Sequence, residues 1–170
     1  VGDTIAIQLA FTIDGETKNI SQCIGADTYA LIVDNGEVVE SNFWDELHPR
    51  TAFGQSAEGD TLIFCVVDGR GKSIGCNTQD LGSIIQHYGA YKAVNWDGGG
   101  SSCMYIRYFG QVNDGSDGRE RAVGNAMFAV ATLPEVDNEI TTLRAYSSTL
   151  NLPKYGIHAP KILGYNKYDV

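Results

Sequence analysis

The chain has 170 residues, which is enough for one domain, or for one domain and the start of another. Its 12 Lys and Arg and 21 Asp and Glu give a net charge of −9, which argues against nucleic acid or an anionic membrane surface as a non-specific partner. No apolar run reaches the roughly 20 residues of a membrane-spanning helix, so we expect no membrane insertion.

The first half of the chain has the composition of β-strands. Apolar, β-branched and aromatic residues predict strands at 4–11, 30–33, 37–39, 51–55 and 61–67. Asn35-Gly36 lies between the second and third of these segments and predicts a tight hairpin. Asp68-Gly69-Arg70-Gly71 then predicts a loop at the end of the fifth strand.

One convincing helix follows. Thr78 is a suitable N-cap, Asp80 suits the first turn, and Gly89 provides the C-terminal stop. Four apolar residues between them fall on one helical face, namely Leu81, Ile84, Ile85 and Tyr88.

Strands at 92–96, 104–108 and 126–131 complete the expected set. The fold class we predict is α+β, strand-dominated, with one main helix covering a face of a largely antiparallel sheet. We assign residues 1–135 to this domain. Residues 136–170, which begin in a Pro- and Asp/Glu-containing linker, we take as a connector and the start of an appended β-rich segment.

Four cysteines are present, and their spacing contains no Cys-x-x-Cys pair, so we expect no zinc site. They are Cys23, Cys65, Cys76 and Cys103. Buried free thiols are the commoner explanation for cysteines in apolar strands, and disulfides are the alternative if the protein is exported. We predict no metal and no cofactor.

The most informative stretch is Asp97-Gly98-Gly99-Gly100-Ser101, between two apolar segments. Three consecutive glycines are tolerated where the backbone turns left-handed or a ligand approaches it closely, and the exposed amides of such a turn can hold an oxyanion. A carboxylate beside an anion site suggests chemistry on a group attached to that anion. The alternative is a hairpin turn in which Asp97 bonds its own backbone.

Two further polar groups lie at strand ends. His48-Pro49-Arg50-Thr51 opens one strand, and an arginine there can grip two phosphate oxygens. Asp68-Gly69-Arg70 closes the next strand. The alternatives are a surface salt bridge for Arg50 and a turn-starting role for Asp68. His48 is the only histidine beside other candidate groups, and it can exchange a proton near neutral pH.

In this order and spacing, the three motifs resemble the phosphodiester glycosidase family. A later family pattern is similar to Asn113, Ser116, Asp117, Gly118, Arg121, Val123 and Asn125, so the resemblance covers residues 30–130. Gly115 stands where proline is common in the family, and Trp96 replaces the usual leucine. Residues 1–29 match no upstream family segment, so we expect the N-terminal part of the family domain to be missing.

The resemblance implies hydrolysis of a sugar-1-phosphodiester at the anomeric C–O bond, which releases a free N-acetylglucosamine-like sugar and a phosphomonoester. Asp97 is then the expected nucleophile or base, Asp68 the second carboxylate or an orienter of Arg50, and His48 a proton shuttle. Retention or inversion depends on the carboxylate separation and stays open. The expected substrate-binding residues are Arg50, Thr51, Arg70, Asn95, Gly98, Gly99, Gly100, Ser101 and Arg121, with Arg50 and the glycine amides as the phosphate clamp and Arg70 or Arg121 as a weaker second cation.

The expected partner is a small-molecule or glycan phosphodiester, and the expected location is extracellular or at the cell envelope. Two other classes of function stay open: a non-catalytic carbohydrate or cell-envelope binding module, and a structural domain of a surface or phage-tail protein. Binding of a sugar phosphate without product separates the first from an enzyme, and no binding indicates the second.

Overall fold

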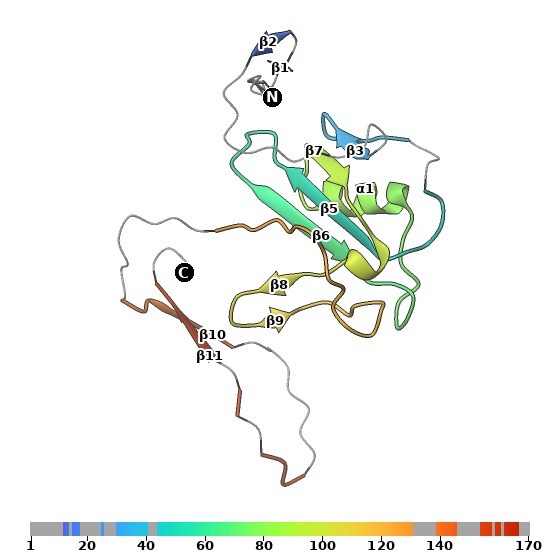
Figure 1. Ribbon diagram of the computed structural model, residues 1–170. Coiled ribbons are helices and arrows are strands. Elements are labelled where there is room, and N and C mark those ends of the chain that lie inside the picture. Colours follow the sequence, from blue (N-terminus) through green and yellow to red (C-terminus); the bar gives the residue numbers. More distant parts are fainter. Residues whose placement is uncertain are drawn as a thin grey trace, which may run out of the picture.

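The computed structural model describes residues 12–13, 15–17, 25, 30–40, 44–130, 139–145, 154–157, 159–160 and 162–166. Its centre is a five-stranded sheet in the order β4-β3-β7-β5-β6, in which every neighbouring pair is antiparallel (Figure 1). The strands are β3 (Leu31–Asp34), β4 (Glu37–Val38), β5 (Arg50–Gln55), β6 (Leu62–Val67) and β7 (Lys92–Asn95). The predicted α+β class with a largely antiparallel sheet is confirmed.

The hairpin predicted at Asn35-Gly36 is confirmed. Asn35 and Gly36 have φ angles of 51° and 79°, which is the pair of positive values that a tight hairpin turn requires. The strands β5 and β6 pair over their whole length, from Arg50 opposite Val67 to Gln55 opposite Leu62.

The helix α1 (Thr78–His87) begins one residue earlier than its predicted cap implies. Asn77 is the N-cap, because its Oδ1 accepts a hydrogen bond from the N–H of Asp80 at 2.7 Å. Thr78 is instead a buried residue of the first turn, so its prediction as the cap was wrong. The stop at Gly89 is confirmed by its φ of +95°.

The core lies between α1 and one face of the sheet. Leu81 and Ile85 of the helix are fully buried, while Ile84 is half-buried and Tyr88 is exposed at the helix end. They pack with residues from three strands, and the buried cluster is Ile32, Val33, Ala52, Cys76, Leu81, Ile85, Ala90 and Ala93. Small residues on β5 and β7 let the helix approach the sheet closely.

Gly82 marks the closest approach of helix and sheet. A Cβ added there would lie 2.8 Å from the carbonyl oxygen of Ile32 and 3.0 Å from Cγ1 of Val38. We expect Gly82→Ala to lower the free energy of unfolding by about 1–3 kcal/mol, although alanine is the better helix former by about 1 kcal/mol. Chemical denaturation tests this prediction. Ser83→Ala, on the exposed side of the same helix, is the control and should stay within about 0.5 kcal/mol of the parent. Equal stabilities of the two variants would contradict the packing argument.

Two later strand predictions differ from the structure. Of 104–108, only β8 (Tyr105–Ile106) is extended, because the chain turns at Tyr108, which has a φ of 70°, and returns as β9 (Gly110–Gln111). Residues 126–130 of the segment expected at 126–131 form no strand, so that prediction was wrong. Most of this segment is exposed, and no sheet edge pairs with it.

Two small hairpins complete the described structure. They are β1 (Thr12–Ile13) with β2 (Glu16–Thr17), and β10 (Thr142–Ala145) with β11 (Ile162–Tyr165). The strand predicted at 4–11 and the domain boundary predicted after residue 135 lie outside the described residues, and the division into 1–135 and 136–170 stays a prediction.

Three cysteines, Cys65, Cys76 and Cys103, are free thiols. Burial raises the pKa of each, and it raises the pKa of Cys76 to about 11 despite the opposing charge of Arg50. These thiols are therefore protonated near neutral pH. In the part of the chain that the structure describes, we find no helix long and apolar enough to cross a membrane.

Candidate active site

A network of side-chain hydrogen bonds joins the motifs that are separated in the sequence. Thr51 Oγ1, on β5, donates to Ser102 Oγ, directly after the glycine turn, at 3.0 Å. The Ser102 carbonyl in turn accepts a bond from Asn113 Nδ2 at 3.0 Å, and the same nitrogen donates to Asp68 Oδ1 at 3.0 Å. One polar chain thus runs from the start of β5, past the glycine turn, to the end of β6.

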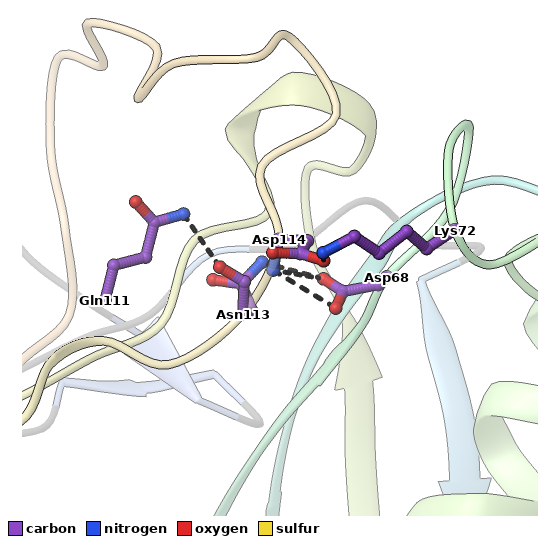
Figure 2. Close-up of polar contacts among 5 residues, drawn as sticks. All are labelled: Asp68, Lys72, Gln111, Asn113 and Asp114. Carbon is purple, nitrogen blue, oxygen red and sulfur yellow. Dashed lines mark hydrogen bonds and ion pairs between the residues drawn. The ribbon is translucent and has the colours of Figure 1, made fainter. Parts of the chain in front are cut away.

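Asp68 is the point where two loops meet. Both of its carboxylate oxygens accept bonds from the N–H of Asp114, each at 3.1 Å, in addition to the bond from Asn113. Figure 2 shows Asn113 and Asp114 facing the carboxylate, with Lys72 reaching across to Asp114. The Lys72 Nζ lies 2.9 Å from Asp114 Oδ2, although both side chains are largely exposed.

Each of the three glycines has a specific packing reason. A Cβ at Gly98 would lie 2.6 Å from the carbonyl oxygen of Pro49, and one at Gly99 would lie 2.9 Å from Nη1 of Arg70. Gly99 also has a φ of +63°, and a Cβ at Gly100 would collide with the ion pair of Asp117 and Arg121. The turn continues into the short helix η1 (Gly99–Ser101), which lies beside the end of β6 (Figure 1). Close approach of backbone and charged side chains explains the triple glycine.

The amides of this turn are less available to an anion than the sequence suggested. The N–H of Gly98 donates to Asp97 Oδ1 at 2.9 Å, and the N–H of Gly99 donates to the carbonyl of Pro49 at 2.9 Å. Asp97 itself is exposed. We therefore remove the Gly98 and Gly99 amides from the expected phosphate clamp.

Arg50 is buried and holds the backbone instead of facing a ligand. Its Nε donates to the carbonyl of Cys76 at 3.1 Å and its Nη2 to the carbonyl of Glu46 at 2.8 Å, while the guanidinium carbon lies 5.8 Å from the centre of the Trp44 ring. Burial lowers the pKa of Arg50 below its ordinary value, against the raising influence of Cys76 and Glu46. Arg50 therefore anchors the start of β5, and the clamp needs another cation.

Arg70, which we expected only as a weaker second cation, is exposed, unlike Arg50. Its backbone is left-handed, with a φ of 59°, which is uncommon for a residue with a side chain and costs of order 1 kcal/mol. Its Nε donates to Nδ1 of His48 at 3.4 Å, and its Nη1 lies against the backbone of Gly99. Because Nδ1 of His48 accepts this bond, the neutral imidazole carries its hydrogen on Nε2. The left-handed backbone conformation of Arg70 thus places its guanidinium between His48 and the glycine turn.

A cavity of about 610 Å³ lies between the loop after β6 and the loop after β9. Arg70 lines it, whereas His48, Asp97 and Gly99 are not among its lining residues. Three cations and two carboxylates are among the residues around it. The lining residues are Asp68, Gly69, Arg70, Gly71, Lys72, Ser73, Gln111, Asn113, Asp114, Gly115, Ser116, Gly118 and Arg119. This local excess of positive charge in a chain of net charge −9 favours an anionic ligand.

Three buried side-chain atoms have no hydrogen-bond partner within the described ranges: Asn95 Oδ1, Trp96 Nε1 and Ser116 Oγ. Leaving such an atom unpaired costs about 1–3 kcal/mol, so a ligand or water that bonds it stabilises the site. Ser116 lines the cavity, but its hydroxyl oxygen is buried within the wall.

The remaining predicted residues are placed as follows. Arg121 is engaged by Asp117, with Nη2 and Nε lying 2.8 and 2.9 Å from Oδ2. Ser101 closes η1 through a bond from its N–H to the carbonyl of Gly98. Sequence reasoning gave no site role to Asn113, Ser102 or Ser116, although Asn113 and Ser116 belong to the later pattern of the resemblance. Lys72 and Arg119 lie in polar loops that carry no such signal.

The site contains no evident metal centre. Over the ranges that the structure describes, no group of three or more His, Cys, Asp or Glu side chains is arranged to hold a metal ion. Asp68 and Asp114, the two carboxylates at the cavity, are already bonded to N–H groups and to Lys72.

The site is thus a charged cavity at the end of an antiparallel sheet, with a left-handed arginine in its wall. The sequence pattern described as phosphodiester glycosidase matches residues 2–130, so the chain belongs to the phosphodiester glycosidase family. This family match begins at residue 2, whereas the resemblance seen in the sequence motifs covers only residues 30–130. The family is described by glycosidase activity on phosphodiesters.

A relative of this chain is found in a bacterial prophage. The SPbeta prophage-derived uncharacterized protein YomE of Bacillus subtilis (strain 168) is 35% identical over 117 residues. These residues are 64% of this chain and 18% of the relative, so the chain spans less than a fifth of that protein's length.

Proposed function

We propose that the domain hydrolyses a sugar-1-phosphodiester at the anomeric C–O bond and releases an N-acetylglucosamine-like sugar and a phosphomonoester. The observation that carries the proposal is Arg70, held by a left-handed backbone against Gly99 and His48 at the wall of a cavity of about 610 Å³. An arginine fixed in this way can bind two oxygens of a phosphodiester.

This hydrolysis does not depend strongly on a general acid. Water adds to the anomeric carbon, its proton passes to a carboxylate, and the electrons of the broken C–O bond go to the phosphate oxygen. A phosphomonoester is a good leaving group, so positive potential at the departing phosphate lowers the barrier most. Arg70 supplies that potential, and Nε2–H of His48 can donate a hydrogen bond to a phosphate oxygen.

Asp97 is the carboxylate that we assign to the reacting carbon. It lies exposed at the start of the glycine turn, and the bond from the Gly98 N–H fixes the direction of its Oδ1. Asn95 and Ser101 would bind the sugar or the phosphate. We propose no cofactor. A glycan phosphodiester outside the cell or at the cell envelope is the expected natural substrate.

The first experiment measures release of free N-acetylglucosamine from UDP-N-acetylglucosamine by the parent and by Asp97→Asn. We expect turnover by the parent and a loss of at least about 100-fold in kcat in the variant, because a positioned acid–base group contributes about 10²–10⁴-fold. Asp60→Asn is the matched control. Asp60 lies in the turn between β5 and β6, where its carboxylate accepts bonds from the hydroxyls of Ser56 and Thr61.

Other outcomes select the alternatives. Full activity of Asp97→Asn would remove Asp97 from the reaction. A rise in Tm with inorganic phosphate but no product would indicate a binding module that keeps the fold without turnover. If the protein forms no product and its Tm does not rise with phosphate, a structural domain is favoured. The prophage origin of the relative also allows that role.

A further inference from the structure

The side chain of Asn113 is bonded on every polar side. Its Nδ2 donates to Asp68 Oδ1 and to the carbonyl of Ser102, each at 3.0 Å, and its Oδ1 accepts from the N–H of Met104 at 2.8 Å. Both amide hydrogens are thus used. One residue therefore ties the end of β6 to the chain that leaves the glycine turn.

Asp68 is held just as completely. Three bonds from N–H donors end on its carboxylate, one from Asn113 and two from the single N–H of Asp114. Each of these donors requires an acceptor, and an ionised carboxylate is an acceptor at both oxygens. Action of Asp68 as nucleophile or base would weaken these bonds, because a protonated or esterified carboxylate is a poorer acceptor.

These contacts fix the distance between the two walls of the cavity. Arg70 follows Asp68 by two residues on one wall, and Ser116 follows Asn113 by three on the other. The Lys72–Asp114 ion pair also joins the walls, but its side chains are 88% and 61% exposed, and exposed pairs contribute little. The partly buried contacts of Asp68 and Asn113 are therefore the main connection.

We propose that Asp68 and Asn113 are a positioning pair that holds the Ser116 wall of the cavity at its working distance from Arg70, and that Asp68 is not a reacting carboxylate. This inference rests on the proposed function, because it takes the cavity to be the phosphodiester site. It replaces the expectation that Asp68 acts as the second carboxylate or orients Arg50.

A residue exchange tests the pair. Asp68→Asn places an amide against the amide of Asn113, and Asn113→Asp places a carboxylate against that of Asp68. We expect each single variant to raise the Kd for inorganic phosphate about 10-fold or more, because a hydrogen bond to a charged group is lost. The double variant Asp68→Asn/Asn113→Asp restores a donor opposite an acceptor, and we expect it to recover part of the lost affinity. Recovery stays partial because the Ser102 carbonyl loses its donor.

A reacting carboxylate predicts a different pattern. Asp68→Asn would then lower kcat with an unchanged Kd for phosphate, and the double variant would stay inactive, since no carboxylate remains at position 68. That pattern overturns the proposal. Asp60→Asn controls for the loss of one negative charge.

Amide hydrogen exchange tests the pair without turnover. We expect the N–H of Asp114 to exchange at least about 10-fold more slowly than an exposed loop amide, because protection reports the free energy of opening the bond. Protection that Asp68→Asn abolishes and the double variant restores supports the pair even if UDP-N-acetylglucosamine is not cleaved, in which case only the proposed function fails. An unprotected Asp114 amide overturns the pair whatever the activity.

Discussion

Arg70→Gly should abolish activity while leaving the protein as stable as the parent, or more stable. Glycine adopts the left-handed backbone of position 70 without penalty, so removal of the side chain also removes strain of order 1 kcal/mol. The guanidinium is lost with it, and loss of one preorganised donor to developing charge lowers kcat by about 10²–10³-fold. Release of N-acetylglucosamine and denaturant-induced unfolding measure the two effects.

Arg50 provides the contrast. Its guanidinium is buried on backbone carbonyls, so we expect Arg50→Ala to lower the free energy of unfolding by about 2 kcal/mol or more. In the folded fraction, phosphate affinity should change far less than in Arg70→Gly. If Arg70→Gly kept full activity, or if Arg50→Ala alone abolished phosphate binding in a stable protein, the assignment of the clamp to Arg70 would be wrong.

A stability gain that accompanies loss of function would identify the strain at Arg70 as part of the site. Natural sequences rarely place arginine at a positive φ, because the Cβ crowds the carbonyl oxygen there. Gly69 precedes it and is equally constrained, since a Cβ would lie 2.8 Å from the nitrogen of Pro49. The loop after β6 thus combines a close approach with a strained arginine, and both features direct one guanidinium toward the turn at Gly99.

Local sequence signals predicted the framework of this fold well. The Asn35-Gly36 hairpin, the strands at 51–55 and 61–67 and the stop at Gly89 depend on residues whose backbone preference is strong, and each is confirmed to within one residue. The segments at 104–108 and 126–131 are also rich in apolar residues, as the confirmed strands are. Whether such a segment becomes a strand depends on a partner edge, which is a property of the whole fold.

The choice between two arginines shows where the sequence was insufficient. Arg50 and Arg70 both flank a strand in a motif, and the sequence favoured Arg50. The sequence contained a signal against Arg50. Ala52 and Gly54 lie two and four residues after it and therefore on the same face of β5, and small residues at that spacing indicate the face that packs closely on the helix. Arg50 therefore had to point into the protein. No comparable signal exists for the left-handed conformation of Arg70, which depends on contacts across the loop.

The network through Asn113 could be predicted only in part. The resemblance includes Asn113, and the pattern carries no information on which groups its amide bonds. Those partners come from two segments that are distant in the sequence: Asp68 follows β6, and Ser102 and Met104 follow the glycine turn. The same applies to Thr51, a predicted substrate ligand whose hydroxyl is bonded to Ser102.

Gly98→Ala should disrupt the turn and the site together. The Cβ would lie 2.6 Å from the carbonyl oxygen of Pro49, which is backbone fixed by a proline ring at the start of β5 and cannot move away at low cost. The turn must shift instead, and with it the Gly99 backbone against which Arg70 lies. We expect a loss of about 1–3 kcal/mol in the free energy of unfolding and a rise of at least about 10-fold in the Kd for phosphate.

Gly124→Ala separates crowding from the loss of a glycine. No atom lies within 4 Å of a Cβ added at Gly124, so alanine should be tolerated there within about 0.5 kcal/mol and should leave phosphate affinity unchanged. Denaturant unfolding and phosphate titration of both variants decide the matter. If Gly98→Ala behaved like Gly124→Ala, the contact with Pro49 would not set the position of the turn. A stable Gly98→Ala protein that binds phosphate poorly would instead show that the place of the turn, more than its contribution to folding, controls the site.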